Sequence, residues 1–301
     1  MIKNILITGA NGQDGKIIVK KLSQKNINLI LIAKKFTNKI KKNNLKYFEF
    51  DLKNNQKLKT IFIKYKIDVI LHLASNNPNY GQNNLKKHYL ENLKNSKVLI
   101  YYSLNIGKKI KFISCSSSRI FKKKKGVVNE KSSVYNKDYY SKFRIEINNY
   151  LSKVSHKNKN FSFVNVILFN HDSSLRNKKF ILPRIIKAIK NKNKTFLNYI
   201  IKENIIMDFS HAEDICNALI KIIFFKGKIN NIILSSGKST FLNEIIRFLI
   251  KKNNVNLKLD FHPIKKNYCI IGNNKFAKRK LNWKIKKNIF IAAQELFKSK
   301  L

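Results

Sequence analysis

The glycines of this chain are few, and three of them fall within seven residues. The 301 residues contain nine glycines, yet Gly9, Gly12 and Gly15 lie together near the start. They follow an apolar run typical of a buried strand and precede a stretch with helical periodicity over 13–24. Glycine permits a sharp turn and a close approach of backbone N–H groups to an anion, which the N-terminus of the following helix also favours. The loop therefore predicts a phosphate-binding strand–turn–helix unit.

Short apolar segments alternate with longer helix-like segments through the first half of the chain. This alternation is typical of βαβ units, and strands that are apolar throughout indicate a sheet covered on both faces. The expected strands are 3–8, 28–33, 47–50, 68–73, 111–116 and 161–169, and the expected helices are 13–24, 55–64, 84–104 and 139–154, with a polar loop over 121–138. We therefore predict an α/β fold with a doubly wound parallel sheet in residues 1–170. Residues 171–301 are expected to form a smaller lobe that is interleaved with the first domain, without a free linker.

The chain carries 63 Lys and Arg against 16 Asp and Glu, a net charge of +47. Such charge favours polyanions, but the lysines are spread throughout and mixed with Asn and Ile, as AT-rich coding produces, and no base-reading motif is visible. We therefore expect no specific nucleic-acid partner. No apolar run has the length of a membrane span or signal peptide, and the three cysteines lack pairing spacing, so we expect no membrane partner and a reducing, cytoplasmic location. The six histidines lack metal-ligand spacing, and we expect no metal.

The loops after the first four predicted strands together predict a dinucleotide site. Such sites use an acidic residue after the second strand for the ribose 2′-hydroxyl of NAD, and cations for the 2′-phosphate of NADP. Here Lys34 and Lys35 follow that strand without a carboxylate, which favours NADP, although lysine is common throughout this chain. The predicted cofactor-binding residues are Gly9, Ala10, Asn11, Gly12, Gln13, Asp14, Gly15, Lys34, Lys35, Asp51, Leu52, Leu73, Ala74 and Ser75. Asp51 is expected at the adenine end, and Leu73 to Ser75 along the phosphates and ribose.

Four segments resemble one family, in order along nearly the whole chain. They are Thr-Gly-Ala-Asn-Gly-Gln-Asp-Gly at 8–15, Leu-Phe-Asn-His-Asp-Ser at 168–173, Asp-Phe-Ser-His-Ala-Glu-Asp at 208–214, and Ile-Gly-Asn through Leu-Asn-Trp at 271–283. The chain resembles the extended short-chain dehydrogenases/reductases, also called the NAD-dependent epimerase/dehydratase family, and within it the GDP-mannose 4,6-dehydratases. The resemblance implies a Rossmann domain, a smaller C-terminal substrate-binding lobe, NADP as cofactor and a nucleotide-sugar substrate, with a GDP-hexose favoured. It also implies a homodimer formed through the helices over 84–104 and 139–154.

The resemblance further implies oxidation at the sugar C4, in which a tyrosinate takes the hydroxyl proton while a hydride leaves for the nicotinamide. Tyr140 stands at the tyrosine of the family's Tyr-x-x-x-Lys, and Arg144 stands at the lysine, which contacts the cofactor ribose. Arginine supplies a permanent charge but relays protons poorly. An alternative register uses Tyr139 and Lys142, and a third reading is a helix whose tyrosines are there by chance. Ser117 matches the Ser/Thr that hydrogen-bonds the reacting oxygen, although it is also a plausible polar strand end.

One position departs from the dehydratases in a way that affects the reaction. Two residues after the Ser/Thr they have a Glu that removes the C5 proton, so that water leaves C6. This chain has Arg119, which cannot act as a base near neutral pH, and Glu130 or Asp138 would have to supply the carboxylate. Three readings stay open. They are a dehydratase, a nucleotide-sugar 4-reductase or epimerase without the dehydration step, and a non-catalytic NADP-binding homologue.

The resemblance also assigns roles in the second lobe. Asn170 and Arg184 are expected to bind substrate, and His171 and Arg176 to contact the cofactor. Arg184 stands where the family has a lysine for the substrate diphosphate. Met207 replaces a substrate-binding arginine, which weakens the case for GDP-mannose itself, and His211 is expected only to pack within the lobe.

Overall fold

The computed structural model describes residues 2–77, 84–261 and 268–299, and the chain forms two compact units. Unit 1 contains Met1–Ile120, Val134–Ile167 and Leu219–Ile232, and unit 2 contains Phe121–Ser133, Leu168–Ala218 and Ile233–Leu301. The junction between Ile167 and Leu168 lies close to the predicted boundary at residue 170. Segment 121–133, within the first half of the chain, belongs to unit 2, and segment 219–232, within the second half, belongs to unit 1. Each unit is therefore built from three stretches of chain.

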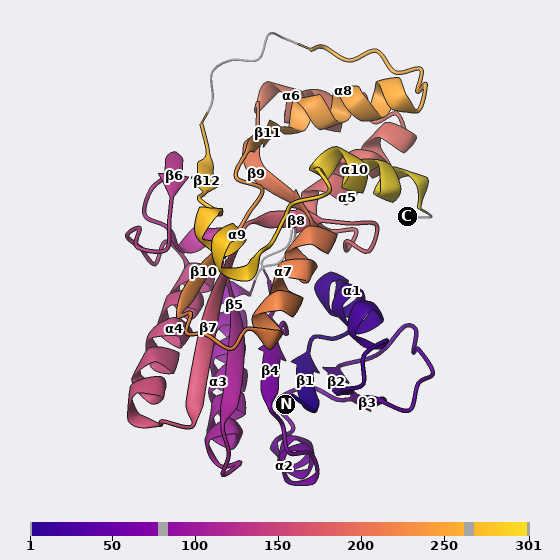
Figure 1. Ribbon diagram of the computed structural model, residues 1–301. Helices are drawn as coiled ribbons and strands as arrows, with labels where there is room; N and C mark the ends of the chain where they lie inside the picture. Colours follow the sequence, from indigo (N-terminus) through magenta and orange to yellow (C-terminus); the bar gives the residue numbers. More distant parts are fainter. Residues whose placement is uncertain (1, 78–83, 262–267, 300–301) are drawn as a thin grey trace. The chain divides into compact units, whose positions relative to one another are not determined.

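Unit 1 is built on the predicted α/β fold, a seven-stranded parallel sheet of order β10-β7-β5-β4-β1-β2-β3. Its strands are β1 (Asn4–Thr8), β2 (Asn28–Ala33), β3 (Leu45–Glu49), β4 (Val69–His72), β5 (Ile110–Ser117), β7 (Phe161–Leu168) and β10 (Asn231–Leu234), whose last two residues belong to unit 2. Its helices are α1 (Gln13–Leu22), α2 (Asn55–Lys64), α3 (Leu85–Leu104) and α4 (Tyr139–Lys157). The helices α3 and α4 lie side by side (Figure 1).

The strand order reverses at β1, and this reversal creates the site. β1 pairs in parallel with both β2 and β4, so that Thr8 lies opposite Ile32 on one side and His72 on the other. From β1 the chain winds outward through β2 and β3, and then in the other direction through β4 and β5. Loops that leave neighbouring strands in opposite directions open a crevice at the carboxyl edge of the sheet. The loops after β1 and β4 are the ones that flank this point.

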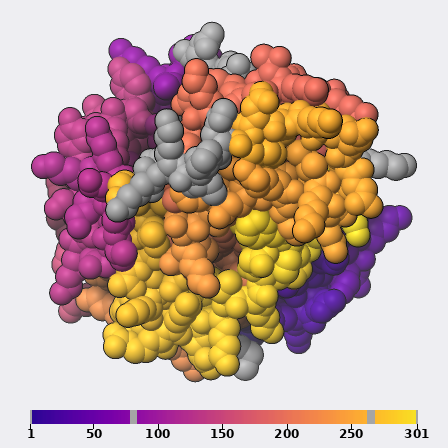
Figure 2. Space-filling model, turned by 90° about the horizontal axis from the view of Figure 1, so that it is seen from above, coloured from indigo at the N-terminus to yellow at the C-terminus, as the bar shows by residue number. Residues whose placement is uncertain are grey.

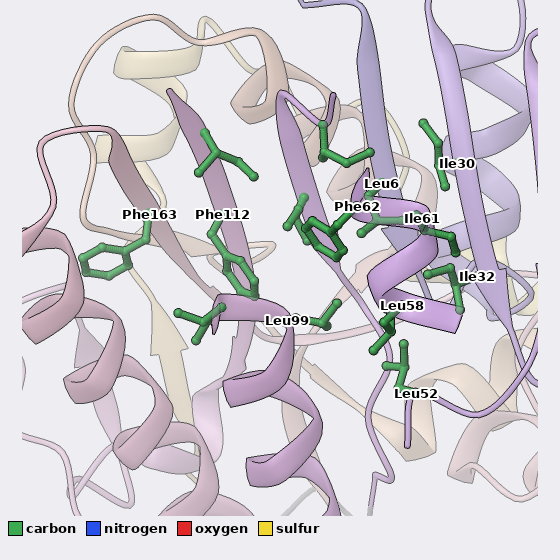
Figure 3. Packing of buried hydrophobic residues seen from close by; sticks show 14 of the residues in the cluster. Leu6, Ile30, Ile32, Leu52, Leu58, Ile61, Phe62, Leu99, Phe112 and Phe163 are labelled. Carbon is green, nitrogen blue, oxygen red and sulfur yellow. The ribbon is translucent and has the colours of Figure 1, made fainter. Parts of the chain in front are cut away.

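The core of unit 1 joins the sheet to its helices. Leu6 and Ile30 of the central strands and Leu58 and Ile61 of α2 belong to one buried cluster, and Figure 3 shows the α2 side chains turned toward these strands. Ile5, on the opposite side of β1, is also fully buried, so both faces of the central strand are covered. Burial of each such side chain contributes about 1.5–3 kcal/mol to folding, which fixes the strand ends that carry the site.

Unit 2 combines a three-stranded sheet, a two-stranded sheet and several helices. Its elements are β6 (Gly126–Val128), β8 (Asn170–Asp172), β9 (Ile206–His211), β11 (Ser239–Phe241), β12 (Ile270–Gly272), α5 (Ile181–Lys190), α6 (Lys194–Lys202), α8 (Leu242–Lys252), α9 (Lys275–Leu281) and α10 (Ile289–Lys298), together with the start of α7 (Ala212–Phe224). The orange and yellow segments of this unit form a continuous surface in Figure 2. Its core is a cluster that includes Ile185, Leu249 and Leu296.

The expectation of a plain loop over 121–138 is wrong in one part. Residues 126–128 form β6, which pairs in parallel with β12 about the register Val127–Ile271. Three residues are too few to show a strand period, and the partner strand lies far along the chain, so no local signal marks this strand. Among the described helices, none combines the length and apolarity that a membrane crossing requires.

Candidate active site

The glycine loop is shaped by two close backbone contacts. Gly9 has φ +71°, and a Cβ there would lie 2.7 Å from the backbone nitrogen of Ala74. A Cβ on Gly15 would lie 2.6 Å from the backbone of Ala10. These distances leave no room for any side chain, so the two glycines bring the loop after β1 against the loop after β4 and α1 against its own entry turn.

The helix α1 begins in this loop without a side-chain cap. Gly12 is its N-cap residue and has no side-chain capping hydrogen bond, so the positive end of the helix dipole lies at this loop and favours an anion. Asn11 ties the loop to the segment after β2, because its side-chain oxygen accepts a hydrogen bond from the hydroxyl of Thr37 at 3.1 Å. Three structural features of the loop therefore favour a bound phosphate group.

A cavity of about 450 Å³ opens beside the glycine loop. The predicted residues that line it are Gly9, Asn11, Gly12, Lys34, Lys35, Asp51, Leu52, Ala74 and Ser75. The other predicted residues of these loops, Ala10, Gln13, Asp14, Gly15 and Leu73, lie beside them without lining this cavity. The glycine cradle, the uncapped helix and the cavity fit a dinucleotide whose diphosphate lies against α1.

Sequence reasoning missed the wall that α3 contributes to this cavity. Glu91, Asn92 and Asn95 line it, together with Asn76 from the loop after β4. In the sequence these three helix residues form only a short polar stretch, in which position 95 lies one helical turn after positions 91 and 92. In a chain rich in Asn and Lys that signal does not stand out.

The rim of the cavity carries alternating charges. Lys34 Nζ lies 2.9 Å from an Asp51 oxygen, and Lys53 Nζ lies 2.7 Å from a Glu91 oxygen. Burial opposes ionisation of Asp51, but the hydrogen bond from Lys34 and that from the backbone of Lys53 outweigh it, so the pKa of Asp51 lies below its ordinary value. The hydrogen bond from Lys53 likewise lowers the pKa of Glu91. Of the two lysines after β2, Lys34 is therefore already paired with a carboxylate.

Tyr140 and Arg144 meet one helical turn apart in α4. The Nη2 atom of Arg144 lies 3.3 Å from the Tyr140 hydroxyl and 3.0 Å from the hydroxyl of Ser75. It also lies 3.2 Å from the side-chain oxygen of Asn77, while Nη1 donates to the carbonyl of Cys115. Arg144 is buried, with 7 % of its surface exposed. The pair is thus joined to the loop that lines the cofactor cavity.

The alternative pair belongs to a different cluster. The ring of Tyr139 lies 5.7 Å from the ring of Tyr89, and the ammonium of Lys142 lies 5.4 Å from that same ring. Lys142 also approaches Glu146 at 3.9 Å. Tyr139 and Lys142 therefore contact α3, whereas Tyr140 and Arg144 contact the loop after β4.

Ser117 and Arg119 lie at the end of β5. The hydroxyl of Ser117 accepts a hydrogen bond from the backbone of Arg119 at 3.3 Å. The guanidinium of Arg119 binds Asp138 at 2.5 Å and lies 6.0 Å from the centre of the Tyr140 ring. Tyr140 is therefore flanked by two guanidinium groups, those of Arg119 and Arg144.

Neither carboxylate proposed as a substitute base stands free. Asp138 caps α4 by accepting from the backbone of Ser141 at 2.8 Å, and its second oxygen binds Arg119. Burial opposes its ionisation, but the Ser141 hydrogen bonds and the charge of Arg119 prevail and lower its pKa. Glu130 accepts a hydrogen bond from the backbone of Ile233 within unit 2. Both carboxylates have structural partners.

The predicted residues of the second lobe lie on β8 and in the segment that follows. Asn170 and His171 are in β8, and the Nδ1 atom of His171 lies 2.7 Å from the carbonyl of Phe169, so that nitrogen carries a proton. Arg176 forms an ion pair with Asp172 at 2.7 Å. Their roles toward cofactor or substrate stay predictions.

Three more residues of this lobe were singled out in the sequence. The guanidinium of Arg184 lies 4.9 Å from the ring of Phe196, and Met207 pairs with Thr240 across β9 and β11. Nε2 of His211 lies 3.2 Å from Glu295, as expected for packing within the lobe. Within the described residues, no group of three or more His, Cys, Asp or Glu side chains is placed to hold a metal ion.

Comparisons with known proteins show the same fold. The chain is similar over nearly its whole length to solved structures of nucleotide-sugar epimerases, and each of the three matches given below covers 97 % of the other protein's chain. UDP-glucose 4-epimerase of Thermotoga maritima, solved with UDP-glucose, covers 98 % of this chain at 17 % identity and TM-score 0.82. UDP-N-acetylglucosamine 4-epimerase of Methanobrevibacter ruminantium, in complex with UDP-N-acetylmuramic acid, covers 99 % at 19 % identity and TM-score 0.81. UDP-glucose-4-epimerase of Stenotrophomonas maltophila, with bound NAD and formylated UDP-arabinopyranose, covers 98 % at 15 % identity and TM-score 0.83.

At these identities the likeness establishes the fold, and no curated protein matches the sequence. The family model described as "NAD dependent epimerase/dehydratase family" matches residues 5–232, about three quarters of the chain. That stretch begins in β1 and ends in β10, so it includes the glycine loop, the cavity and the pair Tyr140–Arg144. The chain therefore belongs to the NAD dependent epimerase/dehydratase family.

Proposed function

We propose that this protein is a nucleotide-sugar 4-epimerase, which oxidises and re-reduces one sugar hydroxyl without removing water. The observation that carries the proposal is the ion pair between Arg119 and Asp138 beside Tyr140. Dehydration needs a free carboxylate next to the reacting carbon, whereas this position holds Arg119, and the carboxylate of Asp138 beside it is engaged by that arginine and by Ser141. Three of the similar solved structures are named 4-epimerases, which supports the same reading.

The residues present supply the proton transfers that such a reaction needs. Tyr140 would take the proton of the C4 hydroxyl through its phenolic oxygen and return it after the sugar has turned. Arg144, 3.3 Å away, would stabilise the phenolate by its fixed positive charge, and Ser117 would hydrogen-bond the reacting oxygen. A bound nicotinamide dinucleotide would supply the hydride chemistry, so that no net oxidation occurs. The substrate contacts proposed for Asn170 and Arg184 complete the assignment.

We propose NADP as the preferred dinucleotide. Lys34 and Lys35 both line the cavity, and the chain has no carboxylate directly after β2, the position expected to bind a ribose 2′-hydroxyl. The ion pair of Lys34 with Asp51 competes with a 2′-phosphate, so the expected preference over NAD is modest. Calorimetric titration with both oxidised dinucleotides measures it directly.

The nucleotide of the substrate has two candidates. Segments 8–15, 168–173, 208–214 and 271–283 resemble GDP-mannose 4,6-dehydratases, which favours a GDP-hexose, whereas the names of several similar structures include UDP-sugars. Met207 in place of the expected arginine weakens the case for GDP-mannose. We therefore propose a nucleotide sugar as the substrate class, with guanine and uracil as the two candidate bases to be tested.

The experiment is incubation of the protein and of Tyr140→Phe with GDP-mannose, UDP-glucose and UDP-N-acetylglucosamine, followed by mass spectrometry and proton NMR. An epimeric product of unchanged mass, formed only by the protein with Tyr140, supports the proposal. Loss of one water would replace it with the dehydratase, and tight dinucleotide binding without turnover of any nucleotide sugar would replace it with the non-catalytic homologue.

We also propose a homodimer through α3 and α4. Large apolar side chains on these helices are exposed in the single chain, among them Leu90 (53 %), Tyr101 (61 %) and Tyr139 (40 %). Light scattering at micromolar concentration tests this, and a monomeric mass would overturn it.

A further inference from the structure

We propose that His72 is a positioning residue that holds the cofactor loop after β4 through a chain of hydrogen bonds with one fixed direction. His72 is the last residue of β4 and is 5 % exposed. The mechanism proposed above does not use it. Its hydrogen-bond partners, however, lead both to the glycine loop and to the loop that contacts Arg144.

The chain of hydrogen bonds begins and ends on backbone groups. The N–H of Ala74 donates to Thr8 Oγ1 at 3.3 Å, and Thr8 Oγ1 lies 2.7 Å from His72 Nδ1. On the other side His72 Nε2 lies 3.0 Å from Ser96 Oγ, which donates to the carbonyl of Asn92 at 2.8 Å. A carbonyl can only accept, so the single proton of the Ser96 hydroxyl goes to Asn92, and Ser96 must accept a hydrogen bond from His72 Nε2–H. In a neutral ring Nδ1 is then the acceptor. Thr8 therefore donates to Nδ1, and Nε2 carries the proton of a neutral ring.

The surroundings of the ring favour the same neutral form. Burial, followed by the positive charge of Arg144, lowers the pKa of His72 to about 3. The ring of Phe112 is an apolar neighbour of the His72 ring, with 5.9 Å between the two ring centres. A second ring proton would face the Thr8 hydroxyl and leave that hydroxyl without an acceptor, which a buried group tolerates poorly.

The same network holds the cofactor loop at two points. Ala74 is held by Thr8, and the side chain of Asn92 brackets Asn76, accepting from its N–H at 2.9 Å and donating to its carbonyl at 3.1 Å. Between these points lies Ser75, which lines the cavity and lies 3.0 Å from Arg144. Ala74 is also the residue against which Gly9 packs. His72 therefore sets the position of one loop that serves both the dinucleotide and the Arg144–Tyr140 pair.

Binding measurements on matched variants test the relay without any sugar substrate. Thr8→Val keeps the shape of the side chain but removes the hydroxyl, and Thr8→Ser keeps the hydroxyl. We expect Thr8→Val to weaken the binding of oxidised NADP by about tenfold, because the loss of one buried hydrogen bond has an effect of this size. Thr8→Ser should weaken it by at most about twofold. Ser96→Ala, which removes a single oxygen farther along the chain, is expected to weaken it by about threefold to tenfold, and it carries the binding test if Thr8→Val does not fold.

A spectroscopic measurement tests the direction of the relay. In the protein labelled with ¹⁵N-histidine, with His72 assigned by comparison with His72→Gln, we expect the Nε2–H tautomer of a neutral ring from pH 7 down to about pH 5. An Nδ1–H tautomer, titration of this ring between pH 5 and 7, or equal dinucleotide affinity of Thr8→Val and Thr8→Ser would each overturn the proposal. This inference deepens the proposed function but fails separately from it. Absence of turnover on nucleotide sugars leaves these results unaffected, and if no dinucleotide binds, the tautomer alone decides.

Discussion

The crevice proposed to bind the dinucleotide and the reaction centre proposed at Tyr140 are built in different ways within unit 1. The crevice is shaped by backbone, because Gly9 and Gly15 admit no Cβ and α1 begins at Gly12 without a side-chain cap. The reaction centre is made by side chains, above all Tyr140 between Arg144 and Arg119. The contrast teaches that backbone-built sites keep their sequence pattern, because few residues can replace glycine. Side-chain sites can exchange a lysine for an arginine and keep the charge while they lose the proton relay.

The strongest test of this contrast removes the phenolic oxygen alone. Tyr140→Phe is expected to lower kcat by about 10²–10⁴-fold, the range that positioned acid–base groups contribute, while dinucleotide affinity changes little. Tyr139→Phe, one residue away and packed on Tyr89, is the matched control and should keep its activity. Comparable losses in both variants would show that the reaction centre is not at Tyr140.

The next test changes the backbone of the crevice and leaves the side chains at Tyr140 untouched. Gly9→Ala places a methyl group 2.7 Å from the backbone of Ala74 at φ +71°, and we expect loss of dinucleotide affinity by about 100-fold, as for strained backbone at a binding loop. Gly107→Ala is the control, since Gly107 has nearly the same φ, +73°, but nothing within 4 Å of its Cβ position. Calorimetry measures both, and equal affinities would mean that the close contact with the loop after β4 has no role in binding.

The link between the two regions should appear in the pH dependence of stability. His72 is neutral in the folded chain, with a pKa near 3, and takes up a proton on unfolding below its ordinary value of 6.5. The folded pKa is depressed, so this contribution is present above pH 6.5 and is lost as pH falls toward 3. Between pH 6 and 5 we expect the unfolding free energy of the protein to fall by up to about 1.4 kcal/mol per pH unit more than that of His72→Asn. Parallel curves from chemical denaturation would contradict a neutral, buried His72.

The smallest effect is expected at the rim of the crevice. Asp51→Asn releases Lys34 from its ion pair, and we expect the ratio of NADP to NAD affinity to rise by about threefold to tenfold, because an exposed ion pair is worth little. Lys39→Gln, which removes a similar exposed ion pair with Glu49 outside the cavity, is the control. An unchanged ratio for Asp51→Asn would mean that Lys34 does not approach the 2′-position.

The sequence predicted the sheet and the crevice well because both depend on local patterns. The apolar strands and the spacing of Gly9 to Gly15 are visible in short windows, and the loops after β2, β3 and β4 follow from strand order. It did not predict β6, whose partner β12 lies more than 140 residues away. It also missed Asn92 and His72, because a network through β1, β4, α3 and the loop after β4 leaves no local period in the sequence. The pairing of Arg119 with Asp138 depends on the turn between β5 and α4, which residue spacing does not specify.

The proposed reaction oxidises and re-reduces one sugar hydroxyl with no water lost. A nucleotide hexose that carries deuterium at C4, incubated with the protein and dinucleotide, tests this when the product is resolved by mass and NMR. We expect a product of the same mass that keeps its deuterium on an inverted C4. A product lighter by one water, or an inverted C4 that carries hydrogen from solvent, would contradict it.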